Sequence, residues 1–413
     1  MRKLTEIDVH LNLLGEATPL CRLSLSPDGK LAWRYSTEIL DSGLEVSPLT
    51  APLNRDTHVI DIRTRLGLQG LPGFIADALP DRWGMRVMEV ALAEAGLLDP
   101  SVCDRLAWQS DRAIGALEFQ PSSDYINEET SWSLRQLQSS ARNVAAGNSE
   151  VLSQAYKHAA GSAGGAYPKF SLAINDDGAL TSTDTLSEGY RPVIIKVPVE
   201  SDLQNRVEIS YARMAEHTGI AVPLCELLED EERGWFVIDR FDRTATNYAY
   251  KLHQCTLAGL LDMDIAEQAI SAEMALAACR HLTQEQSDVV ELYRRILFNY
   301  LAHNCDDHGK NFSFLMDGAG HWRLSPWYDG AYCKVNGGHA MRLGRLRVPT
   351  SRNRYLELAR HAGIRKTDAE LILEEIMATL NDWPKYAEQF GVSELNISEI
   401  NQVLQANCRS AQT

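Results

Sequence analysis

The stretch HNCDDHGKNFSF, residues 303–314, places two aspartates, a lysine and an asparagine directly after an apolar segment. In that preceding segment, DVVELYRRILFNYLAH, apolar residues recur at i, i+3, i+4 and i+7, which predicts a helix buried on one face. The crowding of polar groups against the end of a buried helix makes this loop the first candidate for a functional site.

Composition sets the broad class of the protein. The chain has 413 residues, 45% of them hydrophobic, which suits a globular protein with two or three domains. Its net charge of −16 disfavours unaided wrapping of nucleic acid or an anionic membrane. The eight cysteines include no C-x-x-C pair, which indicates neither a zinc finger nor a disulfide framework. Asp8, His10 and Glu16 interrupt the apolar run that a signal peptide needs, so we expect a soluble cytoplasmic protein.

The first part of the chain mixes strand and helix patterns. Residues 9–65 contain short alternating runs, and Ser26-Pro27-Asp28-Gly29 separates two of them as in a hairpin. Residues 71–98 switch to helical spacing, with a helix start at Pro80 and Asp81. Residues 120–154 are polar, which fits either a junction between subdomains or a long surface segment.

Strand patterns precede a long helical region. They occur at residues 169–174, 192–199 and 234–241, with one helix near residues 206–218. After Asp242 most segments have helical spacing, and the predicted helices are 256–280, 285–303, 351–363, 367–387 and 393–407. The patterns divide the chain into residues 1–120, 121–242 and 243–413.

Within the polar loop, Asp306 and Asn311 have the spacing of the D-x-x-x-x-N catalytic loop of protein kinases. In such a loop the aspartate orients and deprotonates the attacking hydroxyl, while the asparagine oxygen holds Mg²⁺. Asp307 lacks this spacing and is expected to be a solvated or hydrogen-bonding neighbour. Residues 311–330 have the pattern of a hairpin followed by Asp329, whose carboxylate suits Mg²⁺ opposite Asn311. Because so short a pattern also arises by chance, the surrounding sequence must decide whether this loop is catalytic.

Three upstream features supply that context. Lys196 interrupts the apolar run PVIIKVPV and is either a solvated edge residue or a lysine that reaches the α- and β-phosphates of ATP. Glu208 falls in the following predicted helix, where it can pair with Lys196. The segment GSAGGAYPKF carries Gly161, Gly164 and Gly165, and is either a flexible linker or a cradle for phosphate.

The order of these features is the chain order of a kinase fold, and the sequence resembles the HipA family of bacterial serine/threonine kinase toxins. The segment DDHGKNFS matches the family's D-x-H-x-K-N-F-S, which is the most discriminating part of the resemblance. SAGGAYPK, VIIKVP, DRFDR and SPWYDG resemble its glycine loop, lysine strand, linker between lobes and metal segment. LPGFIADALPDRWGMRV resembles its leucine-proline-aspartate stretch, so the likeness covers nearly the whole chain.

The resemblance implies an α+β, two-lobed protein-kinase-like fold with a mixed α/β N-terminal lobe and an all-helical C-terminal lobe. Residues 1–120 are then expected to form the family's N-terminal subdomain of β-hairpins and helices. Residues 121–242 are expected to be the kinase N-lobe with the glycine-rich loop and the lysine strand, and residues 243–413 the C-lobe with the catalytic loop.

The resemblance also implies roles for the site residues, with ATP and Mg²⁺ as cofactors. Asp306 is the expected catalytic base, Lys310 is expected to steady the transferring phosphate, and Asn311 and Asp329 are the expected Mg²⁺ ligands. The other expected contacts of the nucleotide are Lys196, Glu208, Ser162, Gly164, Gly165, His308 and Tyr328, with Asp239 and Phe241 on the adenine side.

Ser162 has a second implied role. It occupies the position of a loop serine whose autophosphorylation, in the family, flips the loop out and shuts ATP binding. A phosphoserine adds up to about two negative charges beside the ATP phosphates, which makes this effect physically reasonable. Tyr167 and Pro168 stand where the family commonly has a polar, acidic pair, so the catalytic match is closer than the regulatory one.

The implied function is an ATP-dependent protein serine/threonine kinase that phosphorylates an aminoacyl-tRNA synthetase and arrests translation as a toxin. The implied partner is a helix-turn-helix antitoxin. No helix-turn-helix is evident within the chain, so DNA contact is expected only through the antitoxin, and no membrane contact is expected. Two other classes stay open: a small-molecule phosphotransferase with the same catalytic parts, and a catalytically silent corepressor.

The run MRLGRLRVPTSRNR is a local concentration of positive charge in an acidic protein. It contains Arg342, Arg345, Arg347, Arg352 and Arg354. The run is either a solvated basic surface or a surface that holds an anionic partner.

A pattern of metal-binding residue types overlaps the catalytic loop. His303, Cys305 and His308 form the sequence H-x-C-x-x-H. A structural zinc site also needs a distant ligand pair at a suitable spacing, which the sequence does not show. We therefore do not expect zinc here.

Overall fold

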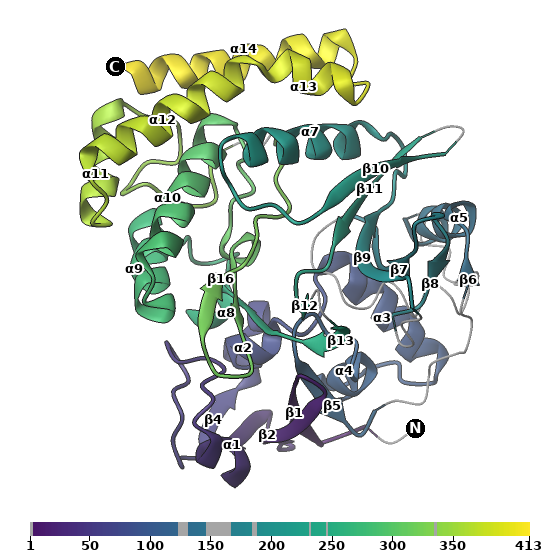
Figure 1. Ribbon diagram of the computed structural model, residues 1–413. Coiled ribbons are helices and arrows are strands. Elements are labelled where there is room, and N and C mark those ends of the chain that lie inside the picture. The colour runs from purple at the N-terminus through teal and green to yellow at the C-terminus, as the bar shows by residue number, and fades with distance from the viewer. Residues whose placement is uncertain are drawn as a thin grey trace.

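The computed structural model describes residues 3–122, 131–145, 167–183, 188–230, 233–244, 247–333 and 337–413. These residues form an α+β fold with antiparallel sheets (Figure 1). The N-terminal strands lie at the bottom of Figure 1, the largest sheet at the right, and the last helices at the top.

The N-terminal part is a five-stranded sheet in the order β4-β3-β2-β1-β5. Its strands are β1 (Glu6–Leu13), β2 (Glu16–Leu25), β3 (Lys30–Tyr35), β4 (His58–Asp61) and β5 (Leu117–Gln120). The predicted hairpin at residues 26–29 is confirmed, because β2 and β3 flank it and pair with each other. Alternate residues of β1 are buried, as a sheet with one covered face requires.

Helices cover this sheet and lead to the next one. They are α1 (Thr37–Ser42), α2 (Gly73–Ala76), α3 (Arg82–Glu94) and α4 (Val102–Gln109). Asp81 is the N-cap of α3, so the helix start predicted there is confirmed.

The second sheet has six strands in the order β10-β11-β9-β7-β8-β6. Its strands are β6 (Ser131–Trp132), β7 (Lys169–Ile174), β8 (Leu180–Thr181), β9 (Arg191–Lys196), β10 (Cys225–Glu229) and β11 (Gly234–Asp239). The three predicted strands are confirmed, and so is the predicted helix, which is α7 (Leu203–His217). One face of the sheet packs on α3 and α5 (Leu134–Ala145), whereas α7 packs against β10 and β11 on the other face.

The expected all-helical C-terminal lobe is wrong, because residues 243–413 also contain strands. They are β12 (Arg243–Thr244), β13 (Asn247–Lys251), β14 (His253–Thr256), β15 (Ser313–Met316) and β16 (Trp322–Leu324). The helix predicted over residues 256–280 is broken into α8 (Leu257–Leu260) and α9 (Ala272–Thr283). Asp262 has φ +56° between them, a conformation that interrupts a helix, and Ser271 caps the second helix anew.

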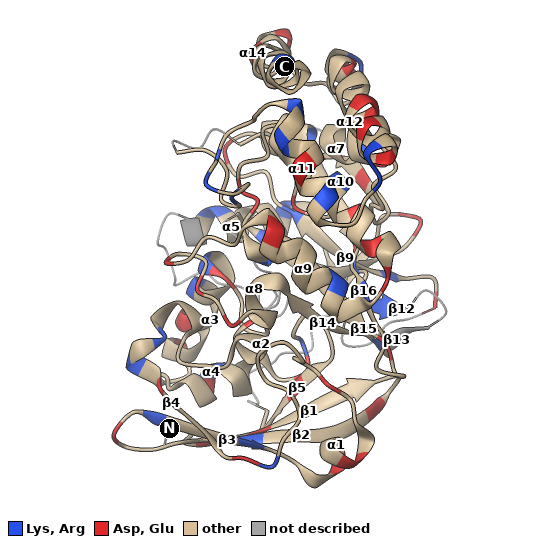
Figure 2. Cartoon of the chain, turned by 90° about the vertical axis from the view of Figure 1, so that its left-hand side faces the viewer, with Lys and Arg blue, Asp and Glu red and all other residues tan. Residues whose placement is uncertain are grey.

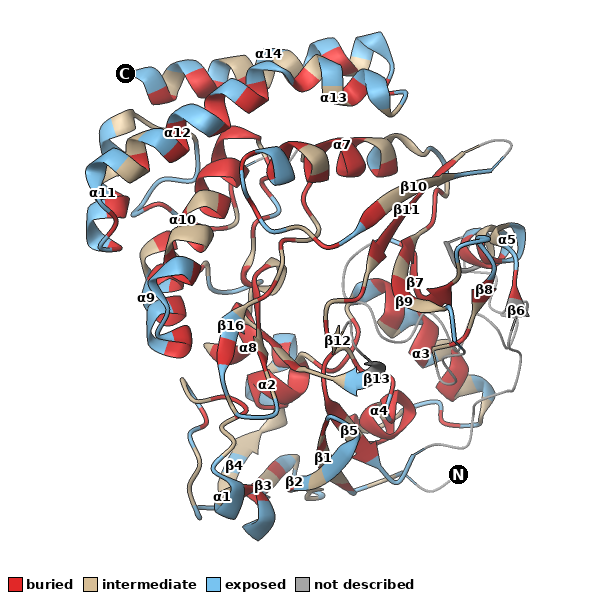
Figure 3. Cartoon of the chain, in the orientation of Figure 1, coloured by how far each residue is buried: buried red, intermediate tan, exposed pale blue. Residues whose placement is uncertain are grey.

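The remaining helices surround α10 (Gln286–Leu301), which leads into the polar loop and is buried along much of its length (Figure 3). They are α11 (Arg352–His361), α12 (Lys366–Asn381), α13 (Trp383–Gln389) and α14 (Glu394–Gln412). The helix predicted over residues 367–387 is broken before Trp383, because Pro384 fits only the first turn of a helix.

A single apolar core joins the N-terminal sheet, α7 and the C-terminal helices, so these parts are packed together. A smaller core lies between the six-stranded sheet and α3 and α5. Within the part of the chain that the structure describes, no helix is both long enough and apolar enough to span a membrane.

Candidate active site

The candidate site forms where β9 meets the loop after β16. Side chains alternate along β9, so Lys196 lies on the opposite face from Val193 and Ile195, which are in the smaller core. The Lys196 ammonium group donates a hydrogen bond to the Asp329 carboxylate, and its Nζ lies 2.6 Å from Oε1 of Glu208 on α7. The Lys196 side chain is 13% exposed and paired, so Lys196 is not a solvated edge residue.

The charges of this cluster stabilise one another. Burial opposes ionisation of Asp329, but Lys169 and Lys196 outweigh it and hold the pKa of this carboxyl well below its usual range. Burial lowers the pKa of Lys196, but Asp329 and Glu208 outweigh it and raise that pKa. Burial raises the pKa of Glu208, and Lys196 opposes this shift. The Lys196–Asp329 pair is therefore ionised at neutral pH.

Lys169 is a member of the cluster that the sequence analysis missed. It is only 5% exposed, and its Nζ lies 3.9 Å from Oδ1 of Asp329. The register between β7 and β9 places Lys169 directly opposite Lys196, on the same face of the sheet. The sequence shows only a lysine at the start of the predicted strand 169–174. The strand register that places this lysine beside Lys196 is a feature of the tertiary structure.

The backbone conformation around Asp329 restricts which residues fit next to it. Asp329 has φ +58°, in the left-handed region that non-glycine residues seldom adopt. At Gly330 a Cβ atom would lie 1.8 Å from Cζ2 of Trp327, so no side chain fits there. The Trp327 amide donates to the Ala221 carbonyl at 2.8 Å, which fixes this loop beside the chain that follows α7.

The catalytic-loop residues occupy a short 3₁₀ helix at Gly309–Asn311 and the residues before it. The Asn311 side-chain amide donates to the Asp306 carbonyl at 2.7 Å, which leaves its oxygen as an acceptor. The Asp306 side chain is 62% exposed, and its Oδ1 lies 3.6 Å from Nε2 of His308. Of the two adjacent aspartates, Asp306 is therefore the one that a substrate can reach.

Asp307 has a different environment. It is fully buried, and its two oxygens accept from His339 Nδ1 at 2.9 Å and from the Met341 amide at 3.0 Å. Of the two expected roles, solvated neighbour or hydrogen-bonding neighbour, Asp307 therefore has the second.

Lys310 connects the loop to the N-terminal part of the chain. Its ammonium group pairs with Asp81, the N-cap of α3, which the sequence analysis treated only as a helix start. Burial lowers the pKa of Lys310, but Asp81 outweighs it and raises that pKa. The Tyr328 hydroxyl donates to the Lys310 carbonyl at 2.8 Å, and the Tyr328 ring lies 5.3 Å from that of Phe241. His308, Lys310, Tyr328 and Phe241 thus lie in one neighbourhood.

Asp239 lies at the end of β11 and is engaged in an ion pair. It pairs with Arg191, which also pairs with Glu226. Burial raises the pKa of Asp239, and Arg191 opposes this shift. The expected adenine-side role of Asp239 stays a prediction.

The expected glycine-loop residues Ser162, Gly164 and Gly165 lie outside the described residues. Their roles therefore remain predictions.

The arginine run is partly paired within the chain. Arg352 pairs with Glu374 at 2.5 Å, and Arg354 pairs with Glu357 at 3.0 Å. Glu374 belongs to α12, which carries several acidic residues on the side shown in Figure 2. These pairs neutralise part of the charge that an anionic partner would contact.

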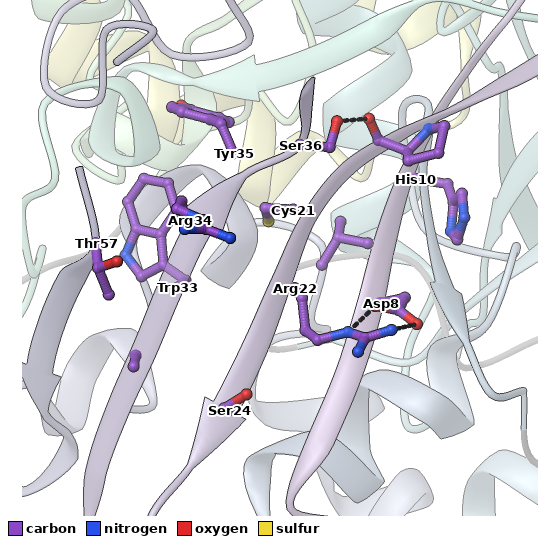
Figure 4. Close-up of a pocket in the computed structure, with 13 residues that line it drawn as sticks. Asp8, His10, Cys21, Arg22, Ser24, Trp33, Arg34, Tyr35, Ser36 and Thr57 are labelled. Carbon is purple, nitrogen blue, oxygen red and sulfur yellow. Dashed lines mark hydrogen bonds and ion pairs between the residues drawn. The ribbon is translucent and has the colours of Figure 1, made fainter. Parts of the chain in front are cut away.

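A separate surface depression lies on the N-terminal sheet (Figure 4). Side chains of β1, β2 and β3 line it, and Arg22 and Asp8 form an ion pair across two of these strands. None of the candidate site residues lines this depression.

Comparison with known proteins agrees with this arrangement. The family model of the HipA-like C-terminal domain matches residues 161–383, and that of the HipA N-terminal domain matches residues 11–120. The chain belongs to the HipA family, which confirms the resemblance in its sequence.

Individual relatives are more distant. A Haemophilus influenzae protein named "Putative kinase" is 28% identical over 179 residues, which are 40% of this chain and 50% of that protein. "Putative kinase Y4mE" of Sinorhizobium fredii is 30% identical over 147 residues, 32% of this chain and 34% of that protein. The chain thus spans half or less of the length of these curated relatives.

The fold has a close counterpart among solved structures. HipA of Shewanella oneidensis MR-1, solved with HipB and its operator DNA, matches with a TM-score of 0.70 and 17% identity. The match covers 98% of this chain and 97% of that one. The likeness therefore extends over the whole fold.

Proposed function

We propose that this protein is an ATP-dependent protein serine/threonine kinase with a two-lobed kinase-like architecture. The observation that carries the proposal is the cluster of Lys196, Glu208 and Asp329, in which a strand lysine, a helix glutamate and the aspartate of the loop after β16 meet. A kinase uses these three residue types to hold the phosphates of ATP and its metal.

The side chains present fit Mg²⁺ and ATP. The carboxylate of Asp329 and the amide oxygen of Asn311 are of the oxygen type that Mg²⁺ prefers. Lys196 and Lys169 supply positive charge on the same face of the sheet, where the phosphates would bind. Bound Mg²⁺ supplies neutralisation of charge on the β- and γ-phosphates.

The protein's own groups have separate roles in the proposed transfer. Asp306 accepts the proton of the attacking serine or threonine hydroxyl, whose oxygen bonds to the γ-phosphorus as the bond to ADP breaks. Lys196 holds the α- and β-phosphates, and Glu208 orients Lys196. Lys310 steadies the transferring phosphoryl group from the catalytic loop.

We also propose the biological setting of the family for this chain. It would act as the toxin of a toxin-antitoxin pair and phosphorylate an aminoacyl-tRNA synthetase in the cytoplasm, where its eight free cysteines stay reduced. The antitoxin would carry the helix-turn-helix and contact DNA, as the acidic chain itself is poorly suited to do so. The HipB and operator DNA of the Shewanella structure support this choice of partner.

The test is transfer of labelled γ-phosphate from Mg-ATP to the protein itself or to purified synthetases. We expect labelling by the wild type, with mapping of the self-labelled site to Ser162, and loss of at least about 100-fold in Asp306→Asn and Asp329→Ala. Asp317→Asn, in the exposed β15–β16 turn, is the matched control and should keep full activity.

Three results would contradict the proposal. Equal labelling by Asp306→Asn and the wild type would remove the catalytic role of the loop. Transfer to hydroxylated metabolites but to no protein would identify a small-molecule phosphotransferase. Failure of the folded protein to bind Mg-ATP would identify a catalytically silent corepressor.

A further inference from the structure

Three side chains with soft or borderline donor atoms converge behind the catalytic loop. The ligand atoms of His303, Cys305 and His339 all lie within 4.8 Å of one another. His303 and Cys305 immediately precede Asp306, whereas His339 comes from the segment after Asp329. His339 takes the place that the sequence pattern assigned to His308, whose Nε2 lies beside Asp306 instead.

Two ring nitrogens of this cluster are buried and have no hydrogen-bond partner among the described residues. Cys305 is 2% exposed and His339 is 0% exposed. The two nitrogens are Nδ1 of His303 and Nε2 of His339. Buried polar atoms without a partner are rare in folded proteins because they lose their hydration without compensation. A bound cation would satisfy both nitrogens.

A second layer of contacts orients His339 for such a role. Its Nδ1 lies 2.9 Å from the buried carboxylate of Asp307, which assigns the proton to Nδ1 and the lone pair to Nε2. Its ring stacks on Tyr300 with a centroid distance of 4.0 Å. A histidine that donates one ring nitrogen to a carboxylate and offers the other to a metal is a common arrangement in metal sites.

The backbone of His303 is also unusual. His303 follows the C-cap of α10 and has φ +54°, in the left-handed conformation that glycine most often supplies after a helix. A histidine adopts this conformation less readily than glycine does. Its side chain, which glycine lacks, lies close to Cys305 and His339.

We propose that His303, Cys305 and His339 form a transition-metal site, with Zn²⁺ as the metal that its donor set fits best. Two imidazole nitrogens and one thiolate suit Zn²⁺, whereas Mg²⁺ prefers oxygen ligands. Tetrahedral zinc places such donors about 3.3–3.7 Å apart, so small side-chain movements close the site. The thiol proton of Cys305 passes to solvent when the metal binds, and water completes the coordination.

The site would cross-link two segments that flank the catalytic base. The Cys333 amide donates to the His303 carbonyl at 3.1 Å, and the His339 amide donates to the Arg347 carbonyl at 2.7 Å. A metal between His303, Cys305 and His339 would add a strong link between these segments next to Asp306. This role goes beyond phosphoryl transfer and does not depend on it.

The test uses the full-length, reduced, metal-free protein without ATP or Mg²⁺. Addition of Co²⁺, as a spectroscopic substitute for Zn²⁺, should give a thiolate-to-cobalt charge-transfer band at one equivalent, and Zn²⁺ should abolish this band. Zn²⁺ should also raise the Tm of the wild type, because it binds the folded state.

The variants separate the site from adventitious binding. Cys305→Ser should abolish the charge-transfer band, and His303→Gln should weaken Zn²⁺ binding by about 100-fold or more, measured by competition with a chromophoric chelator. Asp307→Asn should weaken binding by about 10- to 100-fold through loss of the orienting hydrogen bond. Cys21→Ser, at a buried cysteine on β2 of the N-terminal sheet, and His321→Gln, at an exposed histidine, should behave as the wild type.

The proposal is wrong if the wild type gives no charge-transfer band, or if Cys305→Ser keeps the band and the affinity. Circular dichroism of each metal-free variant establishes that it is folded. Because no nucleotide is present, a negative result here leaves the kinase proposal intact, and a negative kinase assay leaves this one intact.

Discussion

Lys196 donates a hydrogen bond to Asp329 across 133 positions of the chain. The two residues come from an interior strand of the six-stranded sheet and from the loop after the β15–β16 hairpin. Their contact brings the strand lysine and the expected metal ligand to one point. ATP phosphates that bind there would share Lys196 with Asp329.

The first prediction concerns nucleotide binding by Lys196. Lys196→Met should weaken Mg-ATP binding by about 10- to 100-fold, because a charged hydrogen bond to phosphate is lost. Isothermal titration calorimetry measures the change, and Lys366→Met, at an exposed lysine on α12, is the control. Equal affinities of Lys196→Met and the wild type would show that the phosphates bind elsewhere.

The second prediction concerns the link between the catalytic loop and α3. Asp81→Asn leaves the Lys310 ammonium group without its carboxylate partner in a largely buried position. We expect the free energy of unfolding to fall by about 1–3 kcal/mol and phosphotransfer to fall as well. Urea denaturation and the labelling assay measure these effects, with Asp41→Asn on the exposed side of α1 as the control. An unchanged unfolding midpoint would show that the pair contributes nothing.

The third prediction concerns the buried ion pairs of Asp242, which follows the last strand of the six-stranded sheet. Its carboxylate accepts from Arg240 at 2.6 Å, from Arg243 at 2.5 Å and from the Gly115 amide at 2.7 Å. Asp242→Asn should lower the free energy of unfolding by about 3–5 kcal/mol, since it leaves buried arginines uncompensated.

A matched surface pair tests this reasoning. Asp368 pairs with Arg365 at 2.7 Å on the exposed start of α12. Asp368→Asn should change stability little, because water and salt screen this pair. Similar losses in the two variants would contradict burial as the cause.

The fourth prediction concerns the pH dependence of stability. His253 is buried with Nε2 3.0 Å from the Val46 carbonyl, and burial lowers the pKa of His253 from 6.5 to about 4. Between these values the unfolded chain binds a proton that the folded chain does not. The free energy of unfolding therefore falls as the pH falls from about 6.5 to 4, by up to about 3 kcal/mol.

A variant isolates this contribution. His253→Gln cannot titrate, so its stability deficit relative to the wild type should narrow by about 3 kcal/mol between pH 7 and pH 4. His321→Gln, at an exposed histidine, should follow the wild-type profile. If the deficit of His253→Gln stays constant over this range, protonation of His253 does not lower the free energy of unfolding.

Local patterns predicted most elements of the fold. The strand predicted at 169–174 is β7 with the same bounds, and the strand predicted at 234–241 is β11, which ends at Asp239. The helix predicted near residues 206–218 is α7. The predictions failed where tertiary contacts override local spacing. Asp262 accepts from the Gly73 amide at 2.7 Å, pairs with Arg65 and has φ +56°, so the helix predicted over residues 256–280 does not continue past α8.

The sequence by itself determined the polar loop at the end of α10, the strand that carries Lys196 and the family to which the chain belongs. These features depend on residue type and short-range spacing, which the chain displays directly. Only the tertiary structure decided that Lys169 joins Lys196, that Asp81 holds Lys310 and that His339 reaches Cys305. Strand register and loop packing set these contacts, and both arise from burial of apolar surface between distant segments, which no local pattern records.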